Sequence, residues 1–218
     1  MRNKVKAGAT GSGSLFPLIV LASASPRRAE LLKNAQLDVV IRKPEIDERA
    51  RPREQPEELV RRLCQEKAQV IAKDLQNSDS AGVILAADTI VISPRGGSVL
   101  GKPADPRQAE RMLRLLSGNT HTVLTGYCLL GFGLSSEAGK VVRRVVKSRV
   151  TMKSLSAELI HGYVRTGEPM DKAGAYAAQG FGMCFIEKIS GSYTNVVGLP
   201  IAQVLDDLEA EFGIRPRF

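Results

Sequence analysis

The sequence predicts an α/β fold in which a mixed, twisted sheet is flanked by helices. Residues 18–22 and 83–93 are nearly continuous apolar runs, which are typical of strands buried on both faces. Residues 121–130 and 140–153 instead alternate between apolar and polar side chains, as an antiparallel pair of strands does. A hydrophobic fraction of 43% in a chain of 218 residues is enough for one such domain.

The first half of the chain alternates expected strands with helices. After the strand at 18–22, Ser25 is placed as an N-cap and Pro26 as the first residue of a short helix that runs to about Asn34. The remaining elements of this half are, in order, a strand at 39–41, a polar loop at 43–55, a helix at 56–75, a strand at 83–93 that turns through 94–97, and its short partner at 99–100.

The second half opens with another capped helix, for which Asp105 is the cap, Pro106 the start and Gly118 the stop. The elements after it are the antiparallel pair, a helix from Ser156 to Arg165, short strands at 184–189 and 195–197, and a closing helix from Pro200 to Phe212. We expect residues 1–14 to be a disordered tail and residues 15–218 to form a single domain, in one lobe or two.

The composition favours an anionic partner and a reducing compartment. Lysine and arginine outnumber aspartate and glutamate by 31 to 23, a net charge of +8, which suits phosphates, nucleotides or nucleic acid but also simple solubility. Cys64, Cys128 and Cys184 are odd in number and far apart, so they suggest buried free thiols and neither a disulfide framework nor a metal site. The apolar run at 15–22 is too short for a membrane span and is followed by a helix start, so we expect a cytoplasmic protein without a cleaved signal peptide.

Two arginines stand where a helix start already carries partial positive charge. Arg27 and Arg28 follow Pro26 in the first turn, although the free N–H groups and the helix dipole at that end favour acidic residues. A bound anion, most simply a polyphosphate, would resolve this conflict. The alternative is an exposed arginine pair on a solvated turn.

Asp88 lies in the middle of an apolar strand, where a carboxylate is costly unless it is paired, hydrogen-bonded or metal-bound. Lys67 falls inside the apolar stripe of the helix at 56–75, so it either extends to solvent at the helix edge or points into a cleft at a counter-charge. A buried salt bridge between the two would satisfy both, but the location of Asp88 favours a general base or a metal ligand. Glu48 is a candidate second carboxylate for a divalent cation, the usual partner of a triphosphate.

Small residues at 171–180 would let the backbone approach a ligand closely. Within this segment Lys172 adds a positive charge, and Gln179 an amide able to read the edge of a base. Lys102 is a further cation just after the short strand at 99–100. No Walker A or dinucleotide-binding fingerprint occurs in the sequence.

Five segments, in order, carry a specific resemblance to a known family. They are SASPRRAELL at 23–32, ADTIV at 87–91, GKP at 101–103, DKAGAY at 171–176 and GSYTNVVGLP at 191–200. Together they resemble the Maf (septum formation inhibitor-like) family of nucleotide pyrophosphatases over about residues 18–212.

The resemblance implies a fold similar to that of inosine triphosphate pyrophosphatases, with a deep central cleft. It also implies hydrolysis of a nucleoside triphosphate to the monophosphate and pyrophosphate with a divalent cation, Mg²⁺ or Mn²⁺. Asp88 matches the proton acceptor of the family. Arg27, Thr89 and Gln179 match the positions that distinguish its substrate branches, and this set resembles the branch acting on dTTP and UTP. The phosphate- and substrate-binding residues are then Ser23, Arg28, Lys67, Lys102 and Lys172, with Glu48 and Asp88 as metal ligands.

Two other functions remain open at this point. One is clearance of 7-methyl-GTP or another modified purine nucleotide, which is the other branch of the same family. The other is a non-enzymatic binder of nucleic acid or of a cell-division partner that uses the basic surface, a function that leaves the buried Asp88 unexplained. We expect no membrane partner and regard nucleic acid as the weaker partner class. A homodimer is compatible with the sequence.

Overall fold

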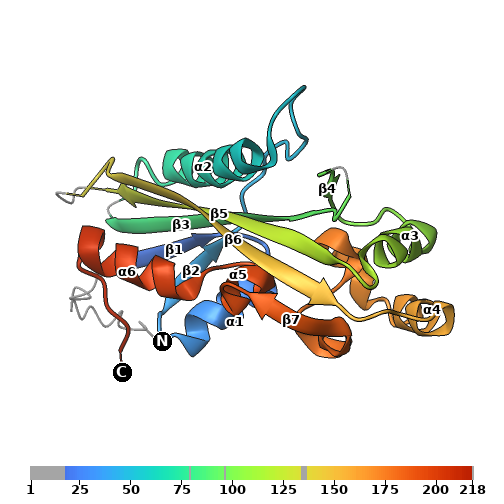
Figure 1. Ribbon diagram of the computed structural model, residues 1–218. Coiled ribbons are helices and arrows are strands. Elements are labelled where there is room, and N and C mark those ends of the chain that lie inside the picture. The colour runs from blue at the N-terminus through green and yellow to red at the C-terminus, as the bar shows by residue number, and fades with distance from the viewer. Residues whose placement is uncertain (1–17, 79, 96, 134–136, 218) are drawn as a thin grey trace, which may run out of the picture.

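The structure of the protein is a computed structural model that describes residues 18–78, 80–95, 97–133 and 137–217 (Figure 1). The expected tail at 1–14 therefore lies outside the described residues. A seven-stranded mixed sheet runs through the molecule in the order β2-β1-β3-β5-β6-β7, with β4 also paired to β3. The strands are β1 (Leu18–Ala22), β2 (Val39–Arg42), β3 (Gly82–Ile92), β4 (Val99–Leu100), β5 (Thr120–Phe132), β6 (Val141–Met152) and β7 (Ile186–Ser190).

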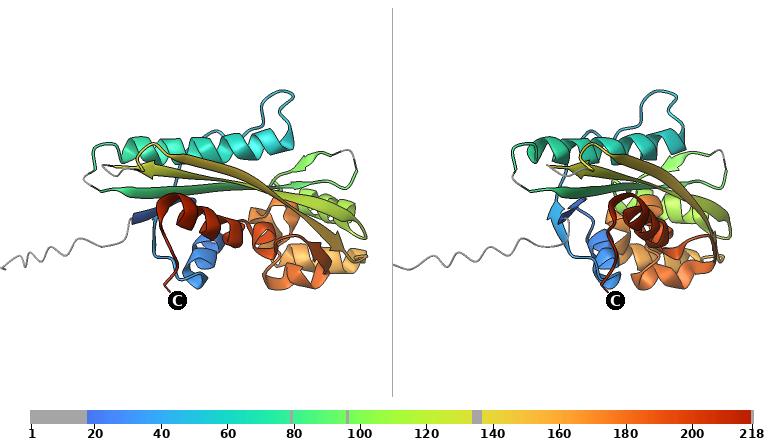
Figure 2. Two further views of the ribbon diagram at one scale, coloured as in Figure 1. Left: turned by 60° about the vertical axis from the view of Figure 1, so that its left-hand side comes forward. Right: turned by 90° about the vertical axis from the view of Figure 1, so that its left-hand side faces the viewer.

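Helices cover both faces and one end of this sheet. They are α1 (Pro26–Asn34), α2 (Pro56–Asp74), α3 (Pro106–Leu116), α4 (Ala157–Arg165), α5 (Tyr193–Val197) and α6 (Ile201–Phe212), with 3-10 turns η1 (Glu168–Asp171), η2 (Ala173–Ala175) and η3 (Gly180–Phe185). α2 lies on one face, whereas α1, α5 and α6 lie on the other, and α3 and α4 pack at the far end (Figures 1 and 2). The expected mixed sheet flanked by helices is confirmed.

The connection of the first three strands creates a topological switch point at β1. β1 pairs in parallel with β2 on one side and with β3 on the other. The chain reaches β2 through α1 and returns to β3 through α2, so the two crossover helices lie on opposite faces of the sheet. Ligands of open α/β sheets bind at the carboxyl ends of strands at such a point. Ser23 is the first residue beyond that end of β1.

A gap along one edge of β3 extends from this switch point. β1 ends at Ala22, which pairs with Ala86, and β4 first pairs at Val91. Residues 87–90 of β3 therefore have a strand neighbour only on the β5 side. Because side chains alternate along a strand, Asp88 points toward the α2 face and Thr89 toward the α1 face. Both can reach the gap, although they lie on opposite sides of the sheet.

The core consists of separate apolar layers on the two faces of the sheet. Under α2, Cys64, Ala68 and Ile71 pack on Val20 and Ile84. On the other face, Leu31 and Leu32 of α1 and Val204 and Leu208 of α6 pack in one cluster with Leu85 of β3. The helices that carry the predicted site residues are thus held by burial of their apolar faces.

The helix starts agree closely with the sequence, and two short elements near the C-terminus do not. The carboxylate of Asp105 accepts the N–H of Gln108 at 2.7 Å, as an N-cap does. The segment expected as a strand at 195–197 is instead the end of α5. The Ser192 hydroxyl accepts the N–H of Asn195 at 3.1 Å, and Gly198 ends the helix with a φ of 132°. The expected strand at 184–189 begins only at Ile186, because the residues before it form η3.

Two smaller expectations are confirmed only in part. The Ser25 side chain makes no capping hydrogen bond, although Ser25 occupies the N-cap of α1. All three cysteines are free and two are buried, but Cys184 is exposed. In the described ranges, no helix is long and apolar enough to cross a membrane.

The close seating of α2 on the sheet depends on Gly126 of β5. A Cβ atom at this glycine would lie 2.5 Å from the carbonyl oxygen of Val60. We expect Gly126→Ala to lower the free energy of unfolding by roughly 1–3 kcal/mol, because helix and strand would have to separate. Urea denaturation measures this change.

Gly162→Ala is the matched control, since a Cβ there would meet nothing within 4 Å in α4. This second change should stabilise the helix by roughly 0.5–1 kcal/mol. Equal effects of the two substitutions would contradict the close contact between α2 and β5.

Candidate active site

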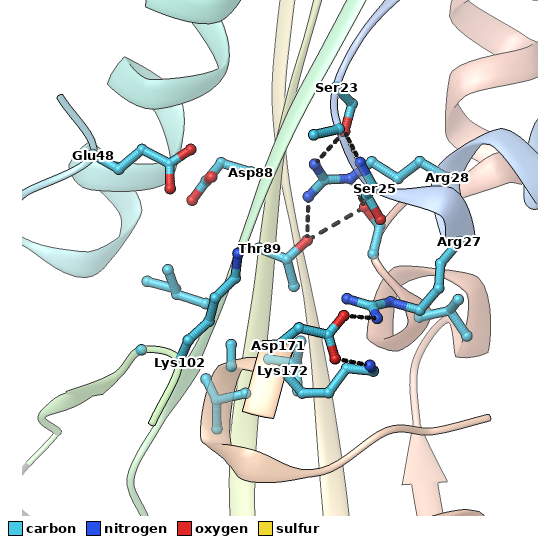
Figure 3. Close-up of a pocket in the computed structure, with 18 of the residues that line it drawn as sticks. Ser23, Ser25, Arg27, Arg28, Glu48, Asp88, Thr89, Lys102, Asp171 and Lys172 are labelled. Atoms are coloured by element: carbon cyan, nitrogen blue, oxygen red, sulfur yellow. Dashed lines mark hydrogen bonds and ion pairs between the residues drawn. The ribbon is translucent and has the colours of Figure 1, made fainter. Parts of the chain in front are cut away.

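All ten predicted site residues line a single cleft of about 680 Å³ beside the gap in β3. The residues are Ser23, Arg27, Arg28, Glu48, Lys67, Asp88, Thr89, Lys102, Lys172 and Gln179. They come from both faces of the sheet and from segments far apart in the chain (Figure 3). The volume lies in the usual range of ligand pockets, and the cleft confirms the expected central cavity.

Arg28 is a buried cation held only by uncharged oxygen atoms. Its Nε donates to the carbonyl oxygen of Gly198 at 2.8 Å, and its two terminal nitrogens donate to the hydroxyls of Ser23 and Thr89, each at 3.1 Å. Only 8% of the residue is exposed, and among the described residues it makes no ion pair. Burial lowers the pKa of Arg28, and the charge of Asp88 opposes this only in part. The exposed arginine pair is therefore excluded for Arg28, whose charge calls for an anion in the cleft.

The N-terminus of α1 supports the same anion site. The hydroxyl of Ser23 accepts the N–H of Ser25 at 3.1 Å, a local bond that turns the chain from β1 into the helix. No acidic residue lies in the first turn of α1, so its N–H groups face the cleft without a negative partner from that turn.

Arg27 differs from Arg28 because it lies at the mouth of the cleft. Its side chain is 27% exposed, and its guanidinium is 3.4 Å from the carboxylate of Asp171. The same carboxylate pairs with Lys172 (Figure 3). Arg27 and Lys172 thus share the exposed carboxylate of Asp171 as their counter-charge. An incoming anion can replace this carboxylate.

Lys67 lies between two carboxylates on the other side of the cleft. Its Nζ is 2.6 Å from an oxygen of Glu48 and 2.6 Å from an oxygen of Asp88. The lysine side chain is 7% exposed, so it points at counter-charges and does not extend to solvent. Burial raises the pKa of Glu48, but the hydrogen bond from Lys67 and the charges around it outweigh that effect and lower the pKa overall. The salt bridge that the sequence allowed is present, and it forms a wall of the cleft.

Glu48 and Asp88 also suit a hard divalent cation. Their oxygens converge on one nitrogen atom, so a metal ion near that point could take a ligand from each. Within the described ranges, no group of three or more His, Cys, Asp and Glu side chains could hold a metal ion by itself. Mg²⁺ commonly binds through one or two carboxylates plus water and substrate phosphates, and this donor set fits that pattern.

The remaining predicted residues differ in how strongly they are held. The hydroxyl of Thr89 lies 2.9 Å from that of Thr125 and 3.3 Å from the oxygen of Gly198, in addition to its bond with Arg28. Neither Gln179 nor Lys102 makes a side-chain hydrogen bond or ion pair in the part of the chain that the structure describes. Both line the cleft and are available to a ligand.

Sequence reasoning missed several partners that hold these groups. The carbonyl of Gly198 carries no side-chain signal, and Thr125 looks like any polar residue of an alternating strand. The charge of Asp171, at the start of the small-residue segment at 171–180, does not by itself predict its place between Arg27 and Lys172.

A group of ion pairs fastens the loop that carries Glu48. Arg62 on α2 contacts Glu54 at 2.6 Å and Glu66 at 3.0 Å, and it donates to the carbonyl oxygen of Arg49 at 3.1 Å. Its side chain is 13% exposed and that of Glu54 is 8% exposed, so these pairs are shielded from solvent. The loop at 43–55 is thereby attached to the helix that carries Lys67.

Comparisons with known proteins identify the family to which the chain is similar. The chain matches the profile of the family described as "Maf-like protein" over residues 18–211. It is 48% identical over 189 residues to a dTTP/UTP pyrophosphatase of Anaeromyxobacter dehalogenans, with 87% of this chain and 91% of that protein covered. A dTTP/UTP pyrophosphatase of Syntrophus aciditrophicus is 44% identical over 191 residues, with 88% of each chain covered.

Among solved structures, a nucleoside-triphosphatase / dITP/XTP pyrophosphatase of Mycobacterium abscessus aligns with 88% of this chain and 92% of its own. The sequence identity is 13% and the TM-score 0.34, which is too low for this likeness to carry an argument.

The attachment of the loop by Arg62 can be tested by limited proteolysis. We expect Arg62→Met to accelerate tryptic cleavage after Arg49 and Arg53 several-fold, because the loop at 43–55 loses the ion pair at Glu54 and the hydrogen bond at the carbonyl of Arg49. Arg61→Met is the control, since it removes an exposed arginine from the adjacent position of the same helix. Equal cleavage rates in the two variants would show that Arg62 does not hold the loop.

Proposed function

Because the chain belongs to the Maf-like protein family, we propose that it is a nucleoside triphosphate pyrophosphatase that hydrolyses dTTP and UTP. One water molecule is consumed, and the products are the nucleoside monophosphate, pyrophosphate and a proton. The observation that carries the proposal is a buried arginine, Arg28, which has no counter-ion among the described residues and lies in the same cleft as the carboxylate of Asp88. The first calls for a polyanion, and the second can take a proton from water.

The triphosphate would bind at the Arg28 end of the cleft. Three of the five guanidinium N–H groups of Arg28 are bound by protein oxygens in the structure, which leaves two for phosphate. Lys102 and the N-terminus of α1 face the same space (Figure 3). Arg27 and Lys172 would add to this end once the substrate competes for their shared partner, Asp171.

The base would be read by Gln179, with Arg27 and Thr89 as the other residues that set substrate choice. A side-chain amide can donate to and accept from the edge of a pyrimidine at the same time. The amide of Gln179 has no hydrogen-bond partner within the described ranges, whereas the hydroxyl of Thr89 holds Arg28 in place. We therefore assign Thr89 an influence on substrate choice that acts mainly through Arg28.

Asp88 is the proposed proton acceptor. The residue is 8% exposed, and its carboxylate accepts a hydrogen bond from Lys67 at 2.6 Å, which fixes its orientation. Asp88 would orient the attacking water and take its proton while negative charge moves onto the pyrophosphate leaving group. Lys67, Arg28 and Lys102 would stabilise that charge electrostatically.

Glu48 and Asp88 would hold the divalent cation that this chemistry requires. A bound Mg²⁺ or Mn²⁺ would neutralise phosphate charge and polarise the phosphorus–oxygen bond. Lys67 occupies the point on which both carboxylates converge, so we expect it to shift its contacts when metal and nucleotide bind together. We further propose a cytoplasmic location, which the free cysteines support.

A substrate panel tests the function. We expect release of pyrophosphate from dTTP and UTP with added Mg²⁺ or Mn²⁺, and loss of turnover when a chelator is present. Asp88→Asn should reduce kcat by roughly 100- to 10,000-fold because the proton acceptor is lost. Asp206→Asn, which changes an exposed aspartate of α6, is the control and should retain full activity.

Two outcomes would overturn the proposal. Much faster turnover of 7-methyl-GTP than of dTTP and UTP would assign the chain to the other branch of the family. An absence of metal-dependent hydrolysis, together with salt-dependent binding of DNA that Asp88→Asn leaves unchanged, would indicate a nucleic-acid binder.

A further inference from the structure

The carboxylate of Glu168 lies outside the cleft and holds the turn that follows Gln179. One of its oxygens accepts the N–H of Phe181 at 3.0 Å, and the other accepts the N–H of Gly182 at 3.0 Å and the hydroxyl of Tyr163 at 2.8 Å. Burial raises the pKa of Glu168, but these hydrogen bonds outweigh it and lower the pKa overall. The group is therefore a charged acceptor, for which such bonds are strong.

Two glycines make room for this carboxylate. Gly180 has a φ of +68°, and a Cβ there would lie 2.5 Å from an oxygen of Glu168. A Cβ at Gly182 would lie 2.4 Å from the carbonyl oxygen of Ala177 and 2.7 Å from the hydroxyl oxygen of Tyr163. The backbone after Gln179 thus folds closely around Glu168 and Tyr163.

Tyr163 holds the segment on the other side of Gln179. Its hydroxyl accepts the N–H of Ala177 at 3.2 Å while it donates to Glu168. The residue is 4% exposed, and its ring packs edge-on against Phe185 with 4.7 Å between the ring centroids. Tyr163 is anchored in α4, so it links the segment at 177–182 to a packed helix.

We propose that Glu168 and Tyr163 are positioning residues that orient Gln179 and thereby set the preference of the cleft among pyrimidine bases. This inference rests on the proposed function. Tyr163 accepts a backbone N–H two residues before Gln179, and Glu168 accepts the backbone N–H groups two and three residues after it. Gln179 itself has no side-chain bond to the described protein. The direction of its amide is therefore set by the backbone that Glu168 and Tyr163 hold.

Conservative substitutions separate positioning from simple support of the fold. Glu168→Gln keeps the shape of the side chain but replaces one acceptor oxygen with a donor group, and Tyr163→Phe removes only the hydroxyl. We expect each to reduce the ratio of kcat/KM for dTTP to kcat/KM for dCTP by about 3- to 10-fold, the loss of one well-placed hydrogen bond. Most of that change should appear in KM for dTTP. Glu187→Gln, an exposed change on β7, is the control and should leave the ratio unchanged.

A double-mutant cycle with Gln179→Ala provides the second measurement. In the Gln179→Ala background, Glu168→Gln and Tyr163→Phe should add less than about 2-fold to the loss of base preference, because they act through the missing amide. Losses that multiply independently would overturn the proposal, as would folded variants with unchanged preference and only reduced thermal stability. Absence of dTTP turnover in the unsubstituted protein would instead contradict the proposed function.

Discussion

The buried ammonium of Lys67, 2.6 Å from the carboxylates of both Glu48 and Asp88, is the contact on which the site depends. Three independent parts of the fold must agree for it to form. α2 must lie close to the sheet, which Gly126 permits. The loop at 43–55 must be fixed to α2, which Arg62 achieves. β3 must leave Asp88 without a strand neighbour on one side, which follows from where β1 and β4 end. A buried charge that loses its partner is costly, so this arrangement is enforced by electrostatics as well as by packing.

The two sides of the cleft differ in whether their cations have carboxylate partners. On the α2 side, one cation is matched by two carboxylates, whereas on the α1 side, within the described residues, the guanidinium of Arg28 is hydrogen-bonded only to neutral oxygens. The proposed metal–triphosphate complex would supply what each side lacks, a divalent cation near the carboxylates and phosphate oxygens near Arg28. This complementarity favours our proposal of a nucleotide with its metal over a simple anion. It also explains how the positions of Asp88 and Thr89, adjacent in sequence but on opposite faces of β3, serve one ligand.

Much of the candidate site could be predicted from charged residues that do not fit their local structural environment. Asp88 in an apolar strand, Lys67 in an apolar helix face and Arg28 at a helix start each conflict with packing or with the helix dipole, and the structure places all three in one cleft. The helix boundaries followed from caps, because Asp105 and Ser156 bind the N–H groups expected of them. The partners of Arg28 were not predictable, since a carbonyl such as that of Gly198 leaves no trace in the side-chain pattern. α5 was mistaken for a strand because its β-branched residues outweighed the cap at Ser192.

We propose that the cleft binds a nucleoside triphosphate with its phosphates at Arg28 and its base at Gln179. The most direct measurement is a crystal structure of the full chain with Mg²⁺ and a non-hydrolysable dTTP analogue. We predict phosphate oxygens within hydrogen-bonding distance of Arg28 and Lys102, the metal ion bound by Glu48 and Asp88, and the thymine edge facing the amide of Gln179. A nucleotide bound in the reverse direction, or phosphates bound outside this cleft, would contradict the account.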